Sequence, residues 1–492
     1  MNKFPLKKDV WYRLRDDRTR RVNGVAGFED FSLGVMVNSQ VQSSYSVQVM
    51  TVITLNLLAR WCRKLKVRMP SNVPSYLPYH QSQNLKELLA KALSDIDPYG
   101  QFDFSDSKID DCNQILIIGQ PERSEELNNK QCLWIDGAGW IAGVGHGSPS
   151  TYLEPSKEDN PIGPAFASCL GVAEIFRQAI GLSPSRARSV WYSLYDFSKI
   201  ERQNRLESPK YVSQFDFGRI HQVGCGAVAS SLDFLISLTR WKAKAHLIDY
   251  DQVNVTNCNR SLSFSAYDAV TRKDKVDACA DALRSSGIRP IKFKGSYAEF
   301  IQEKRFLDFP PDLILCLANE KNVWANIQHN LPPIVFHATT TPNWGVNFGR
   351  HIPKVEWCIM CRFSKEIEHK FSPVCSEVEI KGENNHRKPI QGVLPFLSAT
   401  AAVLILAEMA KMPRDDYPIN EDFVEFSTRD LDTSFLTIQR TPENGCLCNE
   451  QTVDLYPKEV KSSRFWGLSA MPKHNPKNIR KLWQKEVDKT AR

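Results

Sequence analysis

The sequence lacks any apolar run long enough to cross a lipid bilayer. Its longest run, at residues 393–407, is interrupted by Ser398 and Thr400 and ends before Glu408, short of the roughly 18 residues that a spanning helix needs. The opening stretch MNKFPLKKDVWYRL also lacks an apolar core of signal-peptide length. We therefore expect a cytoplasmic protein without membrane contact, in which residues 393–407 form a buried helix.

A disulfide framework and a strong charge of either sign are also lacking. The 13 cysteines are an odd number and are scattered over 492 residues rather than concentrated in one small domain. In a reducing compartment, paired cysteines hold metals more often than they form disulfides. The net charge of +7 would suit phosphates or an acidic partner, but it does not indicate a nucleic acid as partner.

The composition is that of a globular protein with sizeable cores, since 42% of the residues are hydrophobic and 24% are charged. A mixed, charged stretch at 182–214 suggests a connector between two domains. Beyond it, GRIHQVGCGAVASSLDFLISLTRWKAKAHLIDYD has the pattern of a strand, a glycine turn, an apolar helix and a second strand. This βαβ pattern predicts a parallel sheet, which PPDLILCLAN and PPIVFHATT would extend.

The first part of the chain resembles a faint copy of the second. SLGVMVNS, DCNQILIIGQP and KQCLWIDGAGWIAGVG read as strands, and two small-residue helices run from Pro161 to Glu174 and from Pro395 to Glu408. Small-residue helices are common, but with the matching order of elements they favour a duplication. No glycine turn occurs at the corresponding place in the first copy, which would therefore have lost a phosphate site.

A possible nucleotide site lies at the glycine turn. Gly224-Cys225-Gly226-Ala227-Val228-Ala229 fits the pattern G-x-G-x-x-G/A, in which the first glycine permits a tight turn and the second a close approach to phosphate. The following helix would direct N–H groups at an anion. Asp249, at the end of the next strand, is placed to accept a ribose hydroxyl. Such turns also occur in sheets that bind nothing.

Three polar residues help to distinguish whether this turn would bind a triphosphate or a dinucleotide. Asn257 and Arg260 follow the acidic strand end, and Lys275 lies near the start of a helix. A guanidinium and an ammonium group beside a phosphate-binding turn suit a triphosphate better than a dinucleotide, because the charge on the leaving group must be neutralised. The alternative for each residue alone is a solvated basic edge.

Two cysteine pairs predict a structural zinc site. Cys358 and Cys361 form a C-x-x-C pair, and Cys446 and Cys448 form a second, tighter pair. Four thiolates make a closed tetrahedral zinc site without chemistry of its own. The alternative is a group of buried apolar cysteines.

The ordered segments VGCGAVAS, LIDYDQVNVTNCNR, KDKVDA, DLILCLAN, CIMC and CLC resemble the E1-like adenylating enzymes that activate ubiquitin-like proteins, including the bacterial ThiF and MoeB relatives. The resemblance is clear over residues 215–450 and fainter over 1–200. It implies an α/β fold of two Rossmann-like adenylation domains with mostly parallel sheets, a degenerate one at 1–200 and an active one at 201–455, followed by a basic tail at 456–492. The compact layout looks most like the E1-like proteins of bacterial ubiquitin-like conjugation operons, some of which are linked to antiphage defence.

The resemblance also implies roles for single residues. Gly224, Gly226 and Ala227 would line the phosphates of ATP, and Asp249 would hold the ribose. Asn257, Arg260 and Lys275 would position the triphosphate together with Mg²⁺. Cys375 would be the reactive thiol on a crossover loop near 362–392, and it would pass the C-terminus of a ubiquitin-like protein to an E2-like partner.

The sequence departs from the family at three places. Ala227 stands where the family usually has a second glycine, and Asn319 stands where it usually has a magnesium-binding aspartate. Either another acid, such as Asp251 or Glu320, holds the metal, or the activity is weak. The arginine that the partner domain supplies in the family has three possible sources, which are Arg13, Arg15 and Arg18.

Three other functions remain open. A sulfur-carrier adenylyltransferase would share the first reaction but usually needs no degenerate copy. A scaffold that binds a ubiquitin-like protein without catalysis would explain the departures. A nicotinamide oxidoreductase would explain Gly224 and Asp249 but would leave Arg260, Lys275 and the cysteine pairs unexplained.

Overall fold

The computed structural model describes residues 4–22, 25–78, 83–105, 109–120, 132–147, 153, 158–182, 189–200, 209–303, 311–329, 334–341, 343–352, 356–361, 393–414, 421–444, 446 and 448. The expected crossover loop with Cys375, and the basic tail at 456–492, lie outside these residues.

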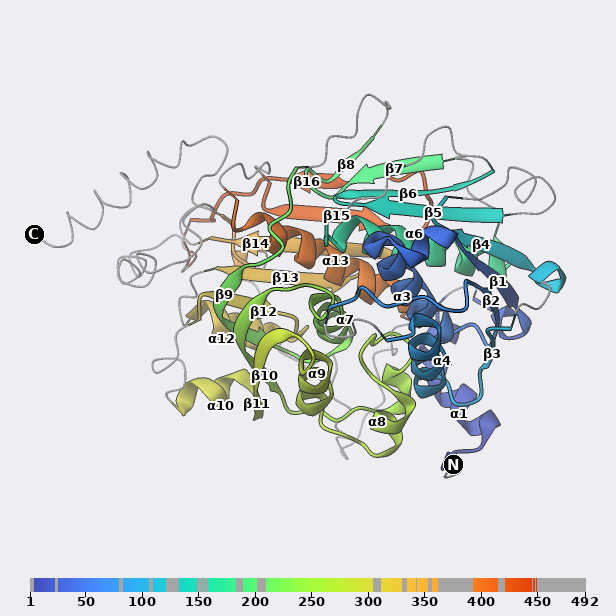
Figure 1. Ribbon diagram of the computed structural model, residues 1–492. Coiled ribbons are helices and arrows are strands. Elements are labelled where there is room, and N and C mark those ends of the chain that lie inside the picture. Colours follow the sequence, from blue (N-terminus) through green and yellow to red (C-terminus); the bar gives the residue numbers. More distant parts are fainter. Residues whose placement is uncertain are drawn as a thin grey trace, which may run out of the picture.

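The described chain forms two eight-stranded sheets (Figure 1). The first sheet has the order β3-β2-β1-β4-β5-β6-β7-β8 and lies within residues 32–199, which we call the first half. Its strands are β1 Ser32–Val37, β2 Lys64–Arg68, β3 Gln101–Asp103, β4 Gln114–Ile118, β5 Cys132–Ala138, β6 Ile141–His146, β7 Ser189–Ser193 and β8 Ser198–Lys199.

The second sheet has the order β11-β10-β9-β12-β13-β14-β15-β16 and lies within residues 216–438, the second half. Its strands are β9 Asp216–Val223, β10 Lys242–Asp249, β11 Gly287–Lys294, β12 Leu313–Cys316, β13 Val335–Thr340, β14 Gly345–His351, β15 Phe423–Ser427 and β16 Leu436–Ile438.

The two sheets have the same topology, strand for strand. In the first, the four pairs from β3 to β5 are parallel and the three pairs from β5 to β8 are antiparallel. In the second, the pairs from β11 to β13 are parallel and those from β13 to β16 are antiparallel. This confirms the prediction of an α/β fold with mostly parallel sheets. The connector prediction for 182–214 is wrong at 189–199, because β7 and β8 pair there with the first sheet.

Buried runs of apolar residues explain the parallel strands. β4 (QILII) and β12 (LILC) are buried at every position, as expected for strands covered on both faces. Such runs carry no alternation, and they were recognisable in the sequence only because turn residues bound them.

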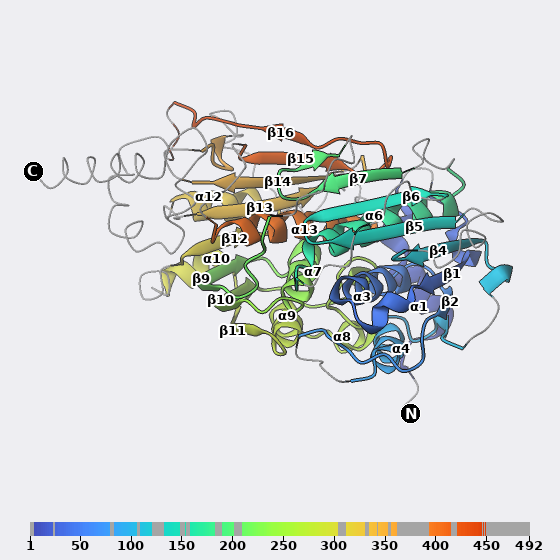
Figure 2. The same cartoon turned by 45° about the horizontal axis from the view of Figure 1, so that its top comes forward.

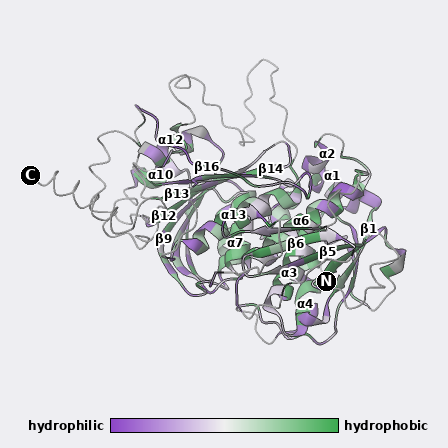
Figure 3. Cartoon of the chain, turned by 90° about the horizontal axis from the view of Figure 1, so that it is seen from above, coloured by the Kyte–Doolittle hydropathy of each residue, from purple (hydrophilic) through white to green (hydrophobic). Residues whose placement is uncertain are grey.

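Four helices fill the space between the sheets: α3 Tyr45–Ala59, α6 Ile162–Ala179, α7 Ala227–Ile236 and α13 Pro395–Lys411. α3, α6 and α13 are buried along nearly their whole length, which fits helices that are apolar on all sides. Figure 2 shows the four helices close together in the middle of the molecule, and in Figure 3 they form a mostly apolar centre with strands on both sides. The expected buried helix at 393–407 corresponds to α13.

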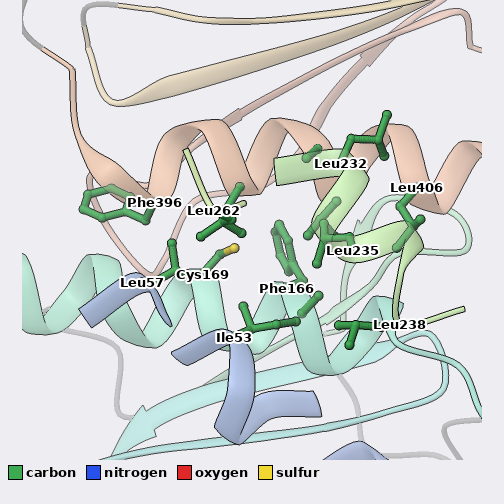
Figure 4. Close-up of a cluster of buried hydrophobic side chains, with 14 of the residues drawn as sticks. Ile53, Leu57, Phe166, Cys169, Leu232, Leu235, Leu238, Leu262, Phe396 and Leu406 are labelled. Atoms are coloured by element: carbon green, nitrogen blue, oxygen red, sulfur yellow. The ribbon is translucent and has the colours of Figure 1, made fainter. Parts of the chain in front are cut away.

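One hydrophobic core joins the two halves. α6 packs on α3 and α13, and α13 packs on α7. Figure 4 shows side chains from all four helices meeting, among them Ile53, Phe166, Leu235 and Leu406. The halves therefore share their interior and form one unit, with the two copies of the small-residue helix at its centre.

The remaining helices lie around this core. They are α1 Lys8–Arg15, α2 Asp17–Arg20, α4 Leu85–Ile96, α8 Ala266–Val270, α9 Lys275–Leu283, α10 Tyr297–Gln302 and α12 Lys321–His329, with the 3-10 turns η1 Phe28–Asp30, η2 Ser39–Gln42, η3 Ile109–Asp111 and η4 Val255–Asn257. Among the described helices, none has the length and apolar character needed to cross a membrane.

Candidate nucleotide site and cysteine cluster

The glycine turn lies between β9 and α7, at the carboxyl end of a parallel strand. Gly224 has a φ of +95°, and a Cβ added to it would lie 2.8 Å from the backbone nitrogen of Ala318. Only glycine fits such a position without strain. An added Cβ on Gly226 would meet nothing within 4 Å, so a ligand has space to approach this backbone. Ala227 is the first residue of α7, whose N-terminal N–H groups suit an anion.

Asp249 closes this turn from the end of β10. Its Oδ2 accepts the N–H of Cys225 at 2.6 Å, and its Oδ1 accepts the N–H of Asp251 at 2.8 Å. Burial raises the pKa of Asp249 above its ordinary value, although the Lys275 ammonium acts in the opposite direction. Because each carboxylate oxygen can accept more than one hydrogen bond, the predicted contact with a ribose hydroxyl remains compatible with this geometry.

Lys275 opens α9 and points at the same group of acids. Its Nζ lies 2.6 Å from Oδ2 of Asp251, and only 13% of its side chain is exposed. Burial alone would lower the pKa of Lys275, but the Asp249 and Asp251 carboxylates outweigh burial and raise it. A charged ammonium group is therefore held beside the glycine turn.

Asn257 and Arg260 lie on one turn beside Lys275. Oδ1 of Asn257 accepts the N–H of Asn254 at 2.9 Å and closes a capping box. The Arg260 guanidinium donates to Oδ1 of Asn259 at 2.9 Å and to the carbonyl of Thr256. Arg260 is close enough to Lys275 to oppose its protonation, so the structure brings the two predicted cations together.

The turn after β12 provides a further acid. Asn319, the residue at the expected metal position, is exposed, whereas Glu320 is half-buried. Burial raises the pKa of Glu320, and repulsion by Asp249 and Asp251 raises it further. Glu320 therefore faces the same site. Carboxylate oxygens are the ligands that Mg²⁺ prefers, so this group of acids fits the metal that the resemblance implies.

The corresponding turn of the first half lacks these features. There Asn38 follows β1, and its Oδ1 accepts the N–H of Gln40 at 2.7 Å while its amide donates to the carbonyl of Gln120. The polar side chain thus satisfies the backbone of its own turn, in the place where the second half has a glycine.

Three arginines were candidates for the role of the partner-domain arginine. One of them, Arg15, has a structural role instead. It is fully buried, and its guanidinium lies 2.6 Å from both Asp16 and Asp97. The α2 helix, which carries Arg18, contacts the second half, because the hydroxyl of Thr19 accepts from the Asn259 amide at 3.0 Å. The α1 helix, which carries Arg13, packs against η4 of the second half.

The four predicted cysteines come together. The Sγ atoms of Cys358, Cys361, Cys446 and Cys448 all lie within 4.8 Å of one another. Cys358 Sγ lies 3.7 Å from that of Cys361 and 3.6 Å from that of Cys446, and the Cys361–Cys448 distance is 3.3 Å. Zn–S bonds of about 2.3 Å in a tetrahedron place sulfurs about 3.8 Å apart, so the cluster fits zinc.

Both ends of the expected crossover loop are described. Cys361 belongs to the cysteine cluster, and the N–H of Val393 donates to the carbonyl of Arg18 at 3.1 Å. The segment 362–392 with Cys375 therefore starts at the candidate metal site and ends beside α2.

Thr19, Asn56 and Arg60 make contacts with residues 258–264 of the second half that no sequence motif predicted. These partners are 198 to 240 residues apart in the chain and share no motif, so no local signal could have identified them.

Comparison with known proteins gives limited likenesses. Residues 32–194, from the start of β1 to just beyond β7, match the model of a family described as the BilD N-terminal domain. No curated protein matches the chain.

Several solved structures are similar to about half of the chain. E. coli MccB with MccA-N7isoASN is 16% identical with a TM-score of 0.34, and the match covers 47% of this chain and 67% of MccB. E. coli MccB by itself is 18% identical with a TM-score of 0.34, and the match covers 47% of this chain and 65% of MccB. The Microcin C7 biosynthetic enzyme MccB in complex with N-formylated MccA is 14% identical with a TM-score of 0.34, and the match covers 47% of this chain and 67% of that enzyme.

Proposed function

We propose that this protein is an E1-like enzyme. It uses ATP to adenylate the C-terminus of a ubiquitin-like protein, takes the protein as a thioester on Cys375, and passes it to an E2-like partner. We place this reaction in the cytoplasm and, by the resemblance in layout, in a bacterial conjugation system of the kind linked to antiphage defence. The first half would be the degenerate adenylation domain and the second half the active one.

One observation carries the proposal. In the second half an open glycine turn, an acidic strand end and two cations converge at the carboxyl edge of the parallel strands, whereas Asn38 fills the corresponding turn of the first half. Ligands bind α/β sheets at this edge. Two basic groups there suit a triphosphate better than a dinucleotide.

Each residue has a definite task in the first step. The substrate carboxylate attacks the α-phosphorus of ATP, an acyl-adenylate forms, the bond to the β-phosphate breaks and pyrophosphate leaves. The backbone of Gly224–Gly226 and the start of α7 would cradle the phosphates, and Asp249 would orient the ribose. Lys275 and Arg260 would stabilise the charge that develops on the leaving pyrophosphate.

In the second step the Cys375 thiolate attacks the acyl carbon, the bond to AMP breaks and a thioester remains. Asp251 and Glu320 would hold Mg²⁺ in place of the usual aspartate, and the metal when bound would supply further charge neutralisation. The four-cysteine cluster would hold zinc as a purely structural ion at the start of the loop that carries Cys375.

A non-reducing gel of the protein with Mg-ATP and a candidate ubiquitin-like protein encoded beside it tests the proposal. We expect a thiol-sensitive adduct that is lost in Cys375→Ala and kept in Cys112→Ala, which changes a cysteine of the first half. An adduct that survives in Cys375→Ala would refute the role of that residue.

Pyrophosphate exchange in the same mixture separates the alternatives. Exchange without an adduct, together with a thiocarboxylate on the small protein, would indicate sulfur-carrier activation. Binding of the small protein without exchange would indicate a scaffold. One zinc ion per chain, lost in Cys358→Ser, is the expected metal content.

A further inference from the structure

Arg60 is a buried arginine of the first half. Its side chain donates hydrogen bonds to backbone carbonyls of the second half and to Asn56, which contacts the second half as well. Arg60 follows the last residue of α3 and has no exposed surface. Its Nη1 donates to the carbonyl of Cys258 at 2.7 Å and to that of Phe264 at 3.3 Å, and its Nη2 donates to the carbonyl of Leu262 at 2.6 Å. Its Nε donates to Oδ1 of Asn56 at 2.8 Å, and the Asn56 amide donates to the same Leu262 carbonyl at 3.1 Å.

These carbonyls belong to the segment that carries Arg260. The N–H of Arg260 donates to the carbonyl of Asn257 at 3.1 Å, and its side chain is held by Thr256 and Asn259 within the same turn. Asn259 is in turn held by the hydroxyl of Thr19. The turn with the two candidate triphosphate residues is thus fixed from one side by its own hydrogen bonds and from the other by the first half.

Within the part of the chain that the structure describes, the acceptors of Arg60 are all neutral oxygens. Buried guanidinium groups are normally paired with carboxylates, because an uncompensated buried charge is costly. Burial lowers the pKa of Arg60 to about 9, which still leaves the group protonated at neutral pH. A buried cation without an acidic partner adds positive potential to its surroundings, and here its surroundings are the turn that would face a triphosphate.

We propose that Arg60 is a positioning residue of the adenylation reaction. It holds the carbonyls of residues 258–264 so that Arg260 and Asn257 point at the nucleotide, and its charge favours the bound triphosphate. The inference rests on the proposed function, and it makes the first half part of the working site even though its own nucleotide turn is filled.

The test compares Arg60→Met and Arg60→Lys with Arg63→Met. Arg63 is a matched control because its guanidinium pairs with Asp16 at 2.8 Å and lies over the Tyr12 ring, both within the N-terminal part of the chain. In pyrophosphate exchange we expect Arg60→Met to raise the KM for ATP about tenfold and to lower kcat further. Arg60→Lys should fall between Arg60→Met and the parent protein, and Arg63→Met should keep both constants within about twofold.

Amide hydrogen exchange of peptide 256–264 gives a second readout that does not require activity. Arg60→Met should accelerate exchange in this peptide at least about tenfold, while Arg63→Met should not. If Arg60→Met does not fold, Asn56→Ala removes the second donor to Leu262 and should give a smaller change in the same direction.

The outcomes separate the two proposals. A parent protein that shows no pyrophosphate exchange would refute the proposed function, and the hydrogen-exchange result would still decide whether Arg60 fixes the turn. Unchanged KM and kcat in a folded Arg60→Met protein would overturn the inference alone. Equal losses in Arg60→Met and Arg63→Met would overturn it as well, because general destabilisation would then account for both.

Discussion

The turns after β1 and β9 hold corresponding places in the two sheets, and the first begins with Asn38 where the second begins with Gly224. In each half the turn after the first strand touches the turn after the fourth. In the second half Gly224 lies against Ala318, whereas in the first half Asn38 lies against Gly119, where an added Cβ would be 3.2 Å from that of Asn38. The glycine at this contact therefore follows the first strand in the second half and the fourth strand in the first half. Close packing of the two turns is preserved, but only the second half leaves its backbone open for an anion.

The sheet does not by itself provide a nucleotide site. Asn38 uses its own side chain to satisfy the N–H of Gln40, so that turn is closed without a ligand. Gly226 has no side chain, and its surroundings are open. A fold of identical topology can therefore serve as a support in one half and as a binding site in the other.

Filling the open turn should give the largest effect. We expect Gly226→Val to lower kcat/KM of pyrophosphate exchange by at least about 1,000-fold, because the new side chain would occupy the space for phosphate. The change should leave the melting temperature nearly unaltered, since an added Cβ meets no protein atom within 4 Å and the φ of Gly226 is −80°.

The matched control is Gln40→Val, at the corresponding turn of the first half. It should leave exchange at the level of the parent protein. A large loss in this control, or an active Gly226→Val protein, would show that the difference between the two turns does not decide nucleotide binding.

The buried glutamates of the central helices allow a second comparison. Glu408 of α13 accepts from Arg350 at 2.6 Å and from Lys411 at 3.3 Å, and both cations are fully buried. Glu174 of α6 accepts from Arg177 at 3.0 Å, and the Arg177 side chain is 11% exposed. We expect Glu408→Gln to lower the free energy of unfolding by about 3 kcal/mol, because it leaves a buried cation without its partner.

Glu174→Gln should cost only about 1 kcal/mol, because water can solvate its partners. Urea denaturation of the two variants measures the difference directly. Equal costs would mean that the two networks are equivalent despite the greater burial of the cations around Glu408.

Much of the fold was readable in the sequence, because buried parallel strands are short apolar runs bounded by turn residues. The glycine turn and the cysteine pairs were readable for a similar reason, since each depends on residues close in the chain. The strands β7 and β8 were missed because SVWYS and SK lie in a charged stretch that resembles a connector. The contacts of Arg60 were missed because they join segments about 200 residues apart, and only packing of the two halves brings them together.

Removing the side chain that closes the first turn should affect stability alone. We expect Asn38→Ala to lower the free energy of unfolding by about 1 kcal/mol, the usual cost of losing a capping side chain. Pyrophosphate exchange per folded molecule should stay unchanged. Loss of exchange in a stable Asn38→Ala protein would show that the filled turn takes part in the reaction.

A last comparison concerns a buried acid of α7 and a buried hydroxyl of α3. Asp233 is the seventh residue of α7, and the seventh residue of α3 is Thr51. Oδ2 of Asp233 accepts from the Gln222 amide at 3.0 Å, and burial raises the pKa of Asp233 to about 7. Thr51 instead donates to the carbonyl of Val47 and carries no charge.

A raised pKa in the folded state makes stability fall as pH rises. Below about pH 4 both the folded and the unfolded chain hold the Asp233 proton, and between about pH 4 and 7 only the folded chain does. The contribution of Asp233 is therefore lost over this window, by at most about 1.4 kcal/mol per pH unit. Urea denaturation of Asp233→Asn between about pH 5 and 7.5 should lack this slope, while Thr51→Val should keep it. If the parent protein and Asp233→Asn have the same pH dependence, Asp233 is ionised in the folded state, and the acid beneath the glycine turn must be stabilised by more than the Gln222 amide.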